Sequence, residues 1–304
     1  MKYRYPAMLH TMPKNLVIFG GFAIGLILMV SIYGVLHARR VYVRQDPVVI
    51  EKSSSLPGLK IALIADLHLG YNSTKSHVRK IVDTINSQNV DLVCIAGDLF
   101  DNDYNAIKDP DEVADILSDI KSRYGTYACW GNHDVSEKIL AGFTFPQKET
   151  IVRDGRFTEF LHHAGITMLE DETVCINNAF YLVGRRDKDM AKKEQLPRKT
   201  FAEITEPLDP SLPIIVMDHQ PGELSEASDA GVDLDLSGHT HDGQMFPANL
   251  VVHFLWENAC GVLKKGAMTS IVTSGAGVWG PAMRVGTNNE VVIANVSFDP
   301  ATDQ

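Results

Sequence analysis

Lys60-Ile61-Ala62-Leu63-Ile64-Ala65-Asp66-Leu67-His68 is the stretch that decides the fold, because an apolar run leads directly into two metal-binding side chains. Residues 60–65 are typical of a short buried strand. Asp66 and His68 follow at a spacing of two, and alternate residues of an extended chain point to the same side. We therefore expect one carboxylate oxygen and one imidazole nitrogen to face a common ion at the end of this strand.

Other apolar runs along the chain end in the same way. The runs at 92–96, 126–130, 214–217 and 234–237 lead into Gly97-Asp98, Gly131-Asn132-His133-Asp134, His219 and Gly238-His239-Thr240-His241. Helical patterns with apolar residues three and four apart occur at 77–85, from residue 111 to 120, and at 157–161. Further strands are expected at 180–183, 270–274 and 290–298. Strand–helix alternation predicts an α/β fold with helices packed on a sheet, and the loops after the strands are where such folds carry function.

The residues at the strand ends have the chemistry of a metal centre. Asp98 could bridge two ions through its two oxygens, Asn132 offers a neutral carbonyl oxygen, and His219 offers a nitrogen. Mixed nitrogen and oxygen ligands suit Mn, Fe or Zn. Two ions about 3.5–4 Å apart can hold a hydroxide and neutralise the oxygens of an in-line phosphoryl displacement. His133 is the candidate general acid or phosphate contact, and Asp134 could orient it.

The ordered series D-x-H, G-D, G-N-H-D, H and G-H-T-H resembles the calcineurin-like metallophosphoesterase superfamily over residues 58–298. The stretches 238–247 and 274–281 look like its membrane-associated bacterial phosphodiesterase branch, although Asp242 stands where that branch often has Gly. The resemblance implies two mixed β-sheets packed as a sandwich and flanked by helices. It also implies one metal held by Asp66, His68, Asp98 and His241, a second held by Asp98, Asn132, His219 and His239, and His133 as the catalytic histidine.

The N-terminal region predicts a membrane anchor. No charged residue occurs from Leu16 to Leu36, and about 20 apolar residues span a bilayer as a helix. A cleaved signal peptide is the alternative, but its apolar part is usually shorter and ends at small residues. We expect a tail at 1–14, one transmembrane helix at 15–37, an irregular linker at 38–57 and the catalytic domain at 58–304. Three basic residues lie on each side of the span, so the positive-inside rule gives a tie, and the α-amino group tips the prediction toward an extracytoplasmic domain.

The charge distribution argues against a nucleic-acid substrate. The net charge is −10, and all 38 acidic residues follow Arg44. Such a body repels long polyanions and lacks the basic stripe that non-specific nucleic-acid binding needs. A small phosphoester or lipid-linked substrate is compatible with it, because bound metal ions set the local field.

Two further segments have alternative interpretations. Arg185-Arg186 follows an apolar run and is either a solvated turn or a contact to a substrate phosphate. The apolar segment 246–262 is either core or a wall that contacts lipid or an acyl chain.

The sequence as a whole predicts a membrane-anchored dimetal phosphoester hydrolase, in which metal-bound hydroxide attacks phosphorus and His133 assists the leaving group. Two alternatives stay open. One is a pyrophosphatase acting on a nucleotide-linked acylated sugar or another lipid-linked substrate. The other is a non-catalytic scaffold tethered to the membrane, which should have lost ligands such as Asp98.

Overall fold

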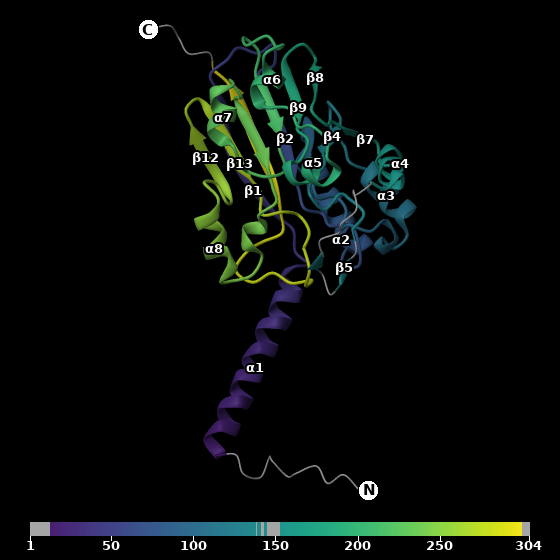
Figure 1. Ribbon diagram of the computed structural model, residues 1–304, viewed down its shortest axis with the longest axis vertical. Helices are drawn as coiled ribbons and strands as arrows, with labels where there is room; N and C mark the ends of the chain where they lie inside the picture. Colours follow the sequence, from purple (N-terminus) through teal and green to yellow (C-terminus); the bar gives the residue numbers. More distant parts are fainter. Residues whose placement is uncertain (1–12, 138, 141–142, 145–152, 300–304) are drawn as a thin grey trace.

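The computed structural model describes residues 13–299 except 138, 141–142 and 145–152. The predicted tail therefore lies almost wholly outside the described residues, as does the end of the chain after 299. Figure 1 shows one long helix, α1 (Lys14–His37), projecting from a body that contains all the strands. The body is built from two six-stranded sheets and a small two-stranded sheet.

The first sheet has the strand order β1-β14-β2-β3-β4-β7. Its strands are β1 (Tyr42–Ile50), β14 (Glu290–Phe298), β2 (Leu59–Ile64), β3 (Leu92–Ala96), β4 (Thr126–Cys129) and β7 (Ile166–Met168). Strands β2, β3, β4 and β7 are parallel, and β14 runs antiparallel to β2. The carboxyl ends of β2, β3 and β4 therefore meet at one edge of this sheet.

The second sheet has the strand order β12-β13-β11-β10-β9-β8. Its strands are β12 (Gly261–Lys265), β13 (Met268–Val272), β11 (Leu234–Ser237), β10 (Ile214–Met217), β9 (Phe180–Gly184) and β8 (Glu172–Ile176). The four central strands are parallel, and the edge strands β8 and β12 are antiparallel to their neighbours. The small hairpin pairs β5 (Ile139–Leu140) with β6 (Phe143–Thr144).

The two sheets pack face to face around an apolar layer. Leu63 and Cys94 of the first sheet share this layer with Leu236 and Ile271 of the second, and all four are fully buried. A second apolar layer fills the outer face of the first sheet, and a third fills the outer face of the second. The predicted sandwich of two mixed sheets flanked by helices is confirmed.

The helices flank the sandwich, and those that contribute buried residues cover its two outer faces. Their bounds are α2 (Lys75–Ser87), α3 (Pro110–Ser118), α4 (Gly155–His163), α5 (Lys188–Glu194), α6 (Phe201–Thr205), α7 (Leu224–Asp229) and α8 (Ala248–Leu255), with short 3₁₀ turns η2 (Tyr104–Ala106) and η3 (His241–Gly243). In α2, Val78, Ile81, Val82 and Ile85 form the buried face that the spacing predicts. The side chain of Thr74 accepts a hydrogen bond from the backbone of His77 and so starts this helix.

The structure differs from the irregular linker expected at 38–57. Residues 42–50 form β1, which pairs in parallel with the whole length of β14. Val48 and Ile50 of this strand are buried. Pro47 has no backbone N–H to donate, and it is tolerated because β1 is an edge strand. The folded body therefore begins about five residues after the end of α1 rather than at residue 58.

Helix α1 is joined to the body by direct contacts. It is long and apolar enough to cross a membrane, and at 24 residues it has a length of about 36 Å. Near its end, the carbonyl of Gly34 accepts a hydrogen bond from the backbone of Arg284 at 3.1 Å. A Cβ at Gly34 would lie 2.9 Å from the terminal methyl of Met283 and 3.0 Å from a methyl of Val285, so these two side chains pack closely against the glycine. The ring of His37 lies 3.1 Å from the carbonyl oxygen of Thr287.

Candidate metal centre

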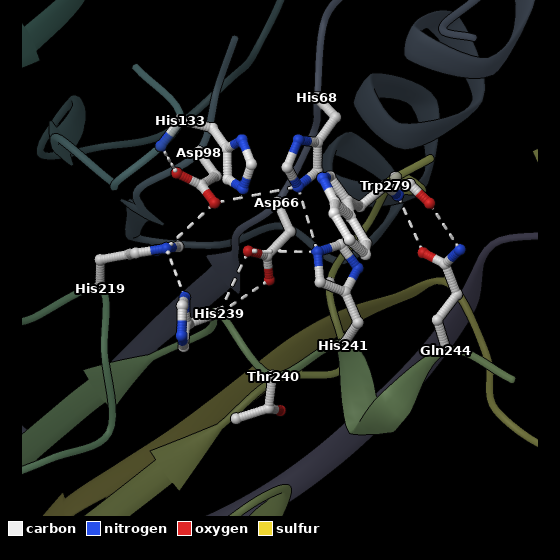
Figure 2. Close-up of polar contacts among 12 residues, drawn as sticks. Asp66, His68, Asp98, His133, His219, His239, Thr240, His241, Gln244 and Trp279 are labelled. Carbon is white, nitrogen blue, oxygen red and sulfur yellow. Dashed lines mark hydrogen bonds and ion pairs between the residues drawn. The ribbon is translucent and has the colours of Figure 1, made fainter. Parts of the chain in front are cut away.

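The predicted ligands converge at one end of the sandwich, where loops of both sheets meet. The first sheet supplies Asp66 and His68 after β2, Asp98 after β3 and Asn132 after β4. The second sheet supplies His219 after β10, and His239 and His241 after β11. Figure 2 shows the carboxylate and histidine side chains of this set turned toward one another. Residues as far apart in the chain as His68 and His241, which are separated by 173 positions, thus contribute to one site.

The backbone at the site is left-handed rather than extended. Positive φ angles occur at five of the predicted ligands, which are Asp66, His68, Asp98, His239 and His241. Non-glycine residues rarely adopt this conformation, and it concentrates where surrounding structure holds a functional geometry in place. Asp66 and His68 do come together as expected, but through backbone with positive φ angles rather than through an extended chain.

Glycines at the site make room for the ligands. A Cβ at Gly97 would lie 2.5 Å from a ring nitrogen of His219, and a Cβ at Gly131 would collide with the carboxylate of Asp98. The Gly-Asp and Gly-Asn-His-Asp motifs thus have a steric basis, since only glycine lets the loops at the site approach one another this closely.

One group of ligand atoms comprises Asp66, His68 and His241. The Nε2 atoms of His68 and His241 are 3.1 Å apart, and Asp66 Oδ1 lies 3.7 Å from His241 Nε2. Asp98 Oδ2 is 3.9 Å from His68 Nε2. These ligand atoms are close enough to bind a single cation.

A second group comprises Asp98, His219, His239 and Asn132. His219 donates from Nδ1 to the carbonyl of Ala96 at 2.8 Å, so its Nε2 carries the lone pair. This nitrogen lies 3.1 Å from Asp98 Oδ2, 3.1 Å from Asn132 Oδ1 and 3.2 Å from His239 Nδ1. Asp98 therefore stands between the two groups and can belong to both.

The donor set fits divalent metal ions. Around His219, a nitrogen lone pair and two acceptor oxygens converge, and a cation is the species that satisfies all three. The groups present six imidazole or carboxylate side chains with no thiolate, which suits Mn, Fe or Zn. Asp66, His68 and His241 would hold one ion, and Asp98, Asn132, His219 and His239 would hold another.

The pKa shifts of the buried ligands indicate that the site favours added positive charge. Burial raises the pKa of Asp66 to about 6. Burial lowers the pKa of His219, but the adjacent Asp98 outweighs burial and raises the pKa overall. Both groups favour binding a proton, which offsets the negative charge that the site concentrates. His239 behaves differently, because burial lowers its pKa to about 3 and leaves its ring neutral, as a metal ligand must be.

His133 lies beside the ligands and is oriented by Asn102. Its Nδ1 donates to Oδ1 of Asn102, while the amide nitrogen of Asn102 donates to Glu137 at 3.1 Å. This bond leaves Nε2 of His133 as the nitrogen that can exchange a proton. Burial lowers the pKa of His133 to about 4. The ring also shares the wall of a cavity of about 310 Å³ with Asp98, His239, His241 and Trp279.

Asp134 has a different position from the one expected. Its carboxylate accepts hydrogen bonds from the backbones of Phe100 and Gly131, at 2.8 and 2.7 Å. It therefore ties the loop after β3 to the loop after β4, and Asn102 takes the orienting role that was predicted for Asp134. Burial raises the pKa of Asp134 to about 7.

The arginine pair is bound by residues other than the predicted ligands. Arg185 is 1% exposed, donates to Asp218 at 2.8 Å and stacks 3.6 Å over the ring of Phe201. Arg186 pairs with Glu170 at 3.2 Å. Arg185 is thus committed to partners inside the fold, and the structure does not bring either arginine together with the ligands.

Several residues near the site were not predicted as site residues, although Gln244 lies in the stretch 238–247 that resembles the family. Asn102 holds His133, and Asp101 Oδ1 lies 3.6 Å from His68 Nδ1. The side-chain amide of Gln244 bonds to both the backbone carbonyl and the backbone amide of Trp279, which fixes that residue at the cavity wall (Figure 2). Arg284 is fully buried and donates to the carbonyl of His241 at 3.1 Å. The stretch 274–281 gave a hint, because it was singled out as a family-like motif.

Comparison with known proteins identifies the family to which the chain belongs. Residues 59–243 match the family model described as calcineurin-like phosphoesterase. A Helicobacter pylori protein named "Uncharacterized metallophosphoesterase" is 32% identical over 251 residues, which cover 82% of this chain and 62% of that protein.

Two further relatives have more specific names. A Danio rerio protein named "Transmembrane protein with metallophosphoesterase domain" is 28% identical over 285 residues, which cover 86% of this chain and 59% of that protein. A Chlamydia muridarum protein named "UDP-2,3-diacylglucosamine pyrophosphatase LpxG" is 24% identical over 228 residues, covering 64% of this chain and 67% of that protein. The chain spans less than two thirds of the length of the Helicobacter and Danio relatives.

Proposed function

The chain belongs to the calcineurin-like phosphoesterase family, and from that premise we propose that it is a membrane-anchored phosphoester hydrolase that uses two metal ions. The observation that carries this proposal is the pair of ligand groups that meet at Asp98, with His133 in the wall of the adjoining cavity. When bound, two such ions lower the pKa of water toward 7 and neutralise charge on the phosphoryl oxygens.

His133 is the proposed proton donor to the leaving group. With a pKa of about 4, its ring is neutral at pH 7, and Nδ1 is already committed to Asn102. A phosphoryl anion beside the ring favours its protonated form and raises its pKa. Binding of the substrate therefore helps Nε2 to carry the proton that the leaving oxygen requires.

The anchor points to a substrate at the membrane. Helix α1 and relatives named as transmembrane proteins indicate membrane association, and we place the domain on the extracytoplasmic side on the basis of the terminal charges. The acidic body disfavours nucleic acids. We therefore favour a phosphodiester or pyrophosphate in a lipid-linked compound as the substrate class.

A pyrophosphatase acting on a nucleotide-linked acylated sugar is a second candidate. It is favoured by the Chlamydia relative, whose name describes that activity. The two candidates separate when the purified chain is given a nucleotide diphosphate-linked acyl sugar and, in parallel, a head-group diester. Release of a nucleoside monophosphate favours the second candidate.

The general proposal is tested with the full chain in lipid nanodiscs, a chromogenic aryl phosphodiester and added Mn²⁺. We expect a metal chelator to abolish turnover. We expect His133→Ala to lower kcat by about 10²- to 10⁴-fold while the bound metal stays the same. His163→Ala is the matched control, because His163 pairs with Asp115 on the surface of α4.

Two outcomes would contradict the proposal. One is a rate that does not change between chelator and Mn²⁺. The other is a metal content near zero after purification and reloading, which favours the non-catalytic scaffold.

A further inference from the structure

We propose that one face of α8 is a second membrane contact, which docks on the leaflet surface next to the end of α1. This apolar face consists of Phe246, Leu250, Val251, Phe254 and Leu255. All five side chains are exposed, with Phe254 at 89% and Leu255 at 72%. The inference concerns a surface outside the proposed catalytic machinery, so it does not require that the chain hydrolyses anything.

The exposed residues lie on one side of the helix. At 3.6 residues per turn, positions 250 and 254 stack along one line of α8 and 251 and 255 along the next. Phe246 is exposed just before the helix begins at Ala248. No Asp, Glu, Lys or Arg occurs from Gly243 to Trp256. A contiguous apolar surface without charge is expensive to leave in water and is typical of helices that lie at a membrane interface.

The opposite side of α8 is fixed to the metal centre. His253 Nε2 lies 3.0 Å from Oδ1 of Asp242, next to the ligand His241. A Cβ at Gly243 would overlap the backbone of Ala248 and Asn249, so this turn and the helix are in direct contact. Ala248 and Val252 line the same cavity as His133. The apolar face therefore cannot turn inward without dismantling the site.

The position of α8 relative to the anchor is also fixed. The backbone of Phe246 donates to the carbonyl of Val285 at 2.8 Å, and the neighbouring Arg284 donates to the carbonyl of Gly34 in α1 at 3.1 Å. Figure 1 shows α8 at the end of the body from which α1 emerges. A bilayer that accommodates α1 is thus continuous with the surface that α8 faces, which argues for lipid as the occupant rather than a second copy of the chain.

The location has a consequence for access. The cavity wall formed by Ala248 and Val252 belongs to the helix that would rest on the lipid head groups. A substrate held in the leaflet could then reach His133 and the ligand groups by a short path along the bilayer surface.

The test measures probe depth in the full chain, reconstituted at one copy per nanodisc. A fluorescent probe is placed at Phe254→Cys in a Cys175→Ser background. The control probe is on the native Cys175, which is exposed on β8, at the end of the body opposite α1 (Figure 1). Cys260 is half-buried and could also take up label. The Cys175→Ser chain without a new cysteine measures this background labelling. Leu250→Cys gives a second reading on the same face.

We expect lipids with a nitroxide on the acyl chain to quench the probes at 254 and 250 several-fold more strongly than the probe at 175. Equal quenching at all three positions overturns the proposal. Quenching at 254 that appears only when discs hold two copies also overturns it and assigns the face to a dimer. Circular dichroism and bound metal confirm that each labelled chain is folded.

Discussion

Two clusters of buried charged side chains lie next to each other, and they are organised by opposite rules. The metal-ligand cluster gathers Asp66, Asp98 and the histidines around shared points, with ligand atoms facing ligand atoms. The arginine cluster, which we define as Arg185, Arg198, Asp218 and Glu223, pairs each cation with a carboxylate. Asp218 and the ligand His219 are adjacent in sequence, so the two clusters share one loop.

The comparison shows that buried charge by itself does not identify a binding site. The arginine cluster is balanced in charge, because Asp218 Oδ2 accepts from Arg185 at 2.8 Å and from Arg198 at 2.7 Å, although Asp218 Oδ1 and Arg185 Nε have no hydrogen-bond partner among the described residues. The metal-ligand cluster has an excess of acceptors that only an added cation can satisfy. We therefore expect substitutions in the first cluster to affect stability and substitutions in the second to affect metal binding and turnover.

The largest effect is expected for Asp98→Asn, which removes the carboxylate charge shared by both ligand groups. Loss of that ligand should lower kcat/KM for the aryl diester by at least about 10³-fold, because a metal ion supplies several kcal/mol of transition-state stabilisation. Metal content should fall in parallel, and the thermal midpoint in chelator should not decrease. Asp83→Asn, on the exposed face of α2, is the control. Full metal content with normal turnover in Asp98→Asn would contradict the role of Asp98 as a ligand shared by both groups.

Arg185→Met is expected to act on stability. It leaves Asp218 with one cation fewer in a buried position, and breaking a buried pair costs about 3–5 kcal/mol. Denaturant unfolding measures the loss, and Arg186→Met, whose arginine is only partly buried, should lose less. If Arg185 instead binds a substrate phosphate, KM will rise while the free energy of unfolding stays unchanged.

The smallest effect on stability is expected for Asp235→Asn. Asp235 lies close to the arginine cluster, but its carboxyl group is hydrogen-bonded to hydroxyls. Ser270 donates to Asp235 at 2.9 Å, and burial raises the pKa of Asp235 to about 7. The folded state therefore holds a proton that the unfolded state releases at lower pH, so wild-type stability falls as pH rises from about 4 to about 7.

The amide at position 235 cannot ionise, so it should remove this loss. At pH 8, Asp235→Asn should be more stable than wild type by about 1–3 kcal/mol, and at pH 4 the difference should nearly vanish. Thermal unfolding at several pH values measures it. Asp229→Asn, exposed on α7, should show no such trend. A constant difference at every pH would show that ionisation of Asp235 is not its cause.

The sequence predicted that the side chains of the metal-ligand cluster converge, because each of them follows a strand within a few residues. Apolar runs such as 60–65 and 92–96 are buried strands, and parallel pairing brings their ends to one edge. The sandwich was predicted through the family resemblance. The contacts of the arginine cluster could not be predicted, because Arg185 meets Asp218 only after β9 and β10 pair.

Other features were missed for physical reasons. Strand β1 contains Arg44, Asp46 and Pro47, which are atypical of strands, and its pairing depends on β14 at the far end of the chain. The role of Asn102 depends on the loop after β4 folding over the loop after β3. The apolar segment 246–262 could equally have been core, since only packing decides which apolar residues remain uncovered.

The close contact at Gly34 restricts the motion that a domain on a flexible linker normally has. With α1 in a bilayer as proposed, a body held to it through Gly34, Met283 and Arg284 keeps a set height and tilt above the plane in which the helix diffuses. Its diffusion toward partners is then two-dimensional and restricted to molecules in the same bilayer. Inserting a flexible spacer at this joint would convert it into a protein that searches a volume instead.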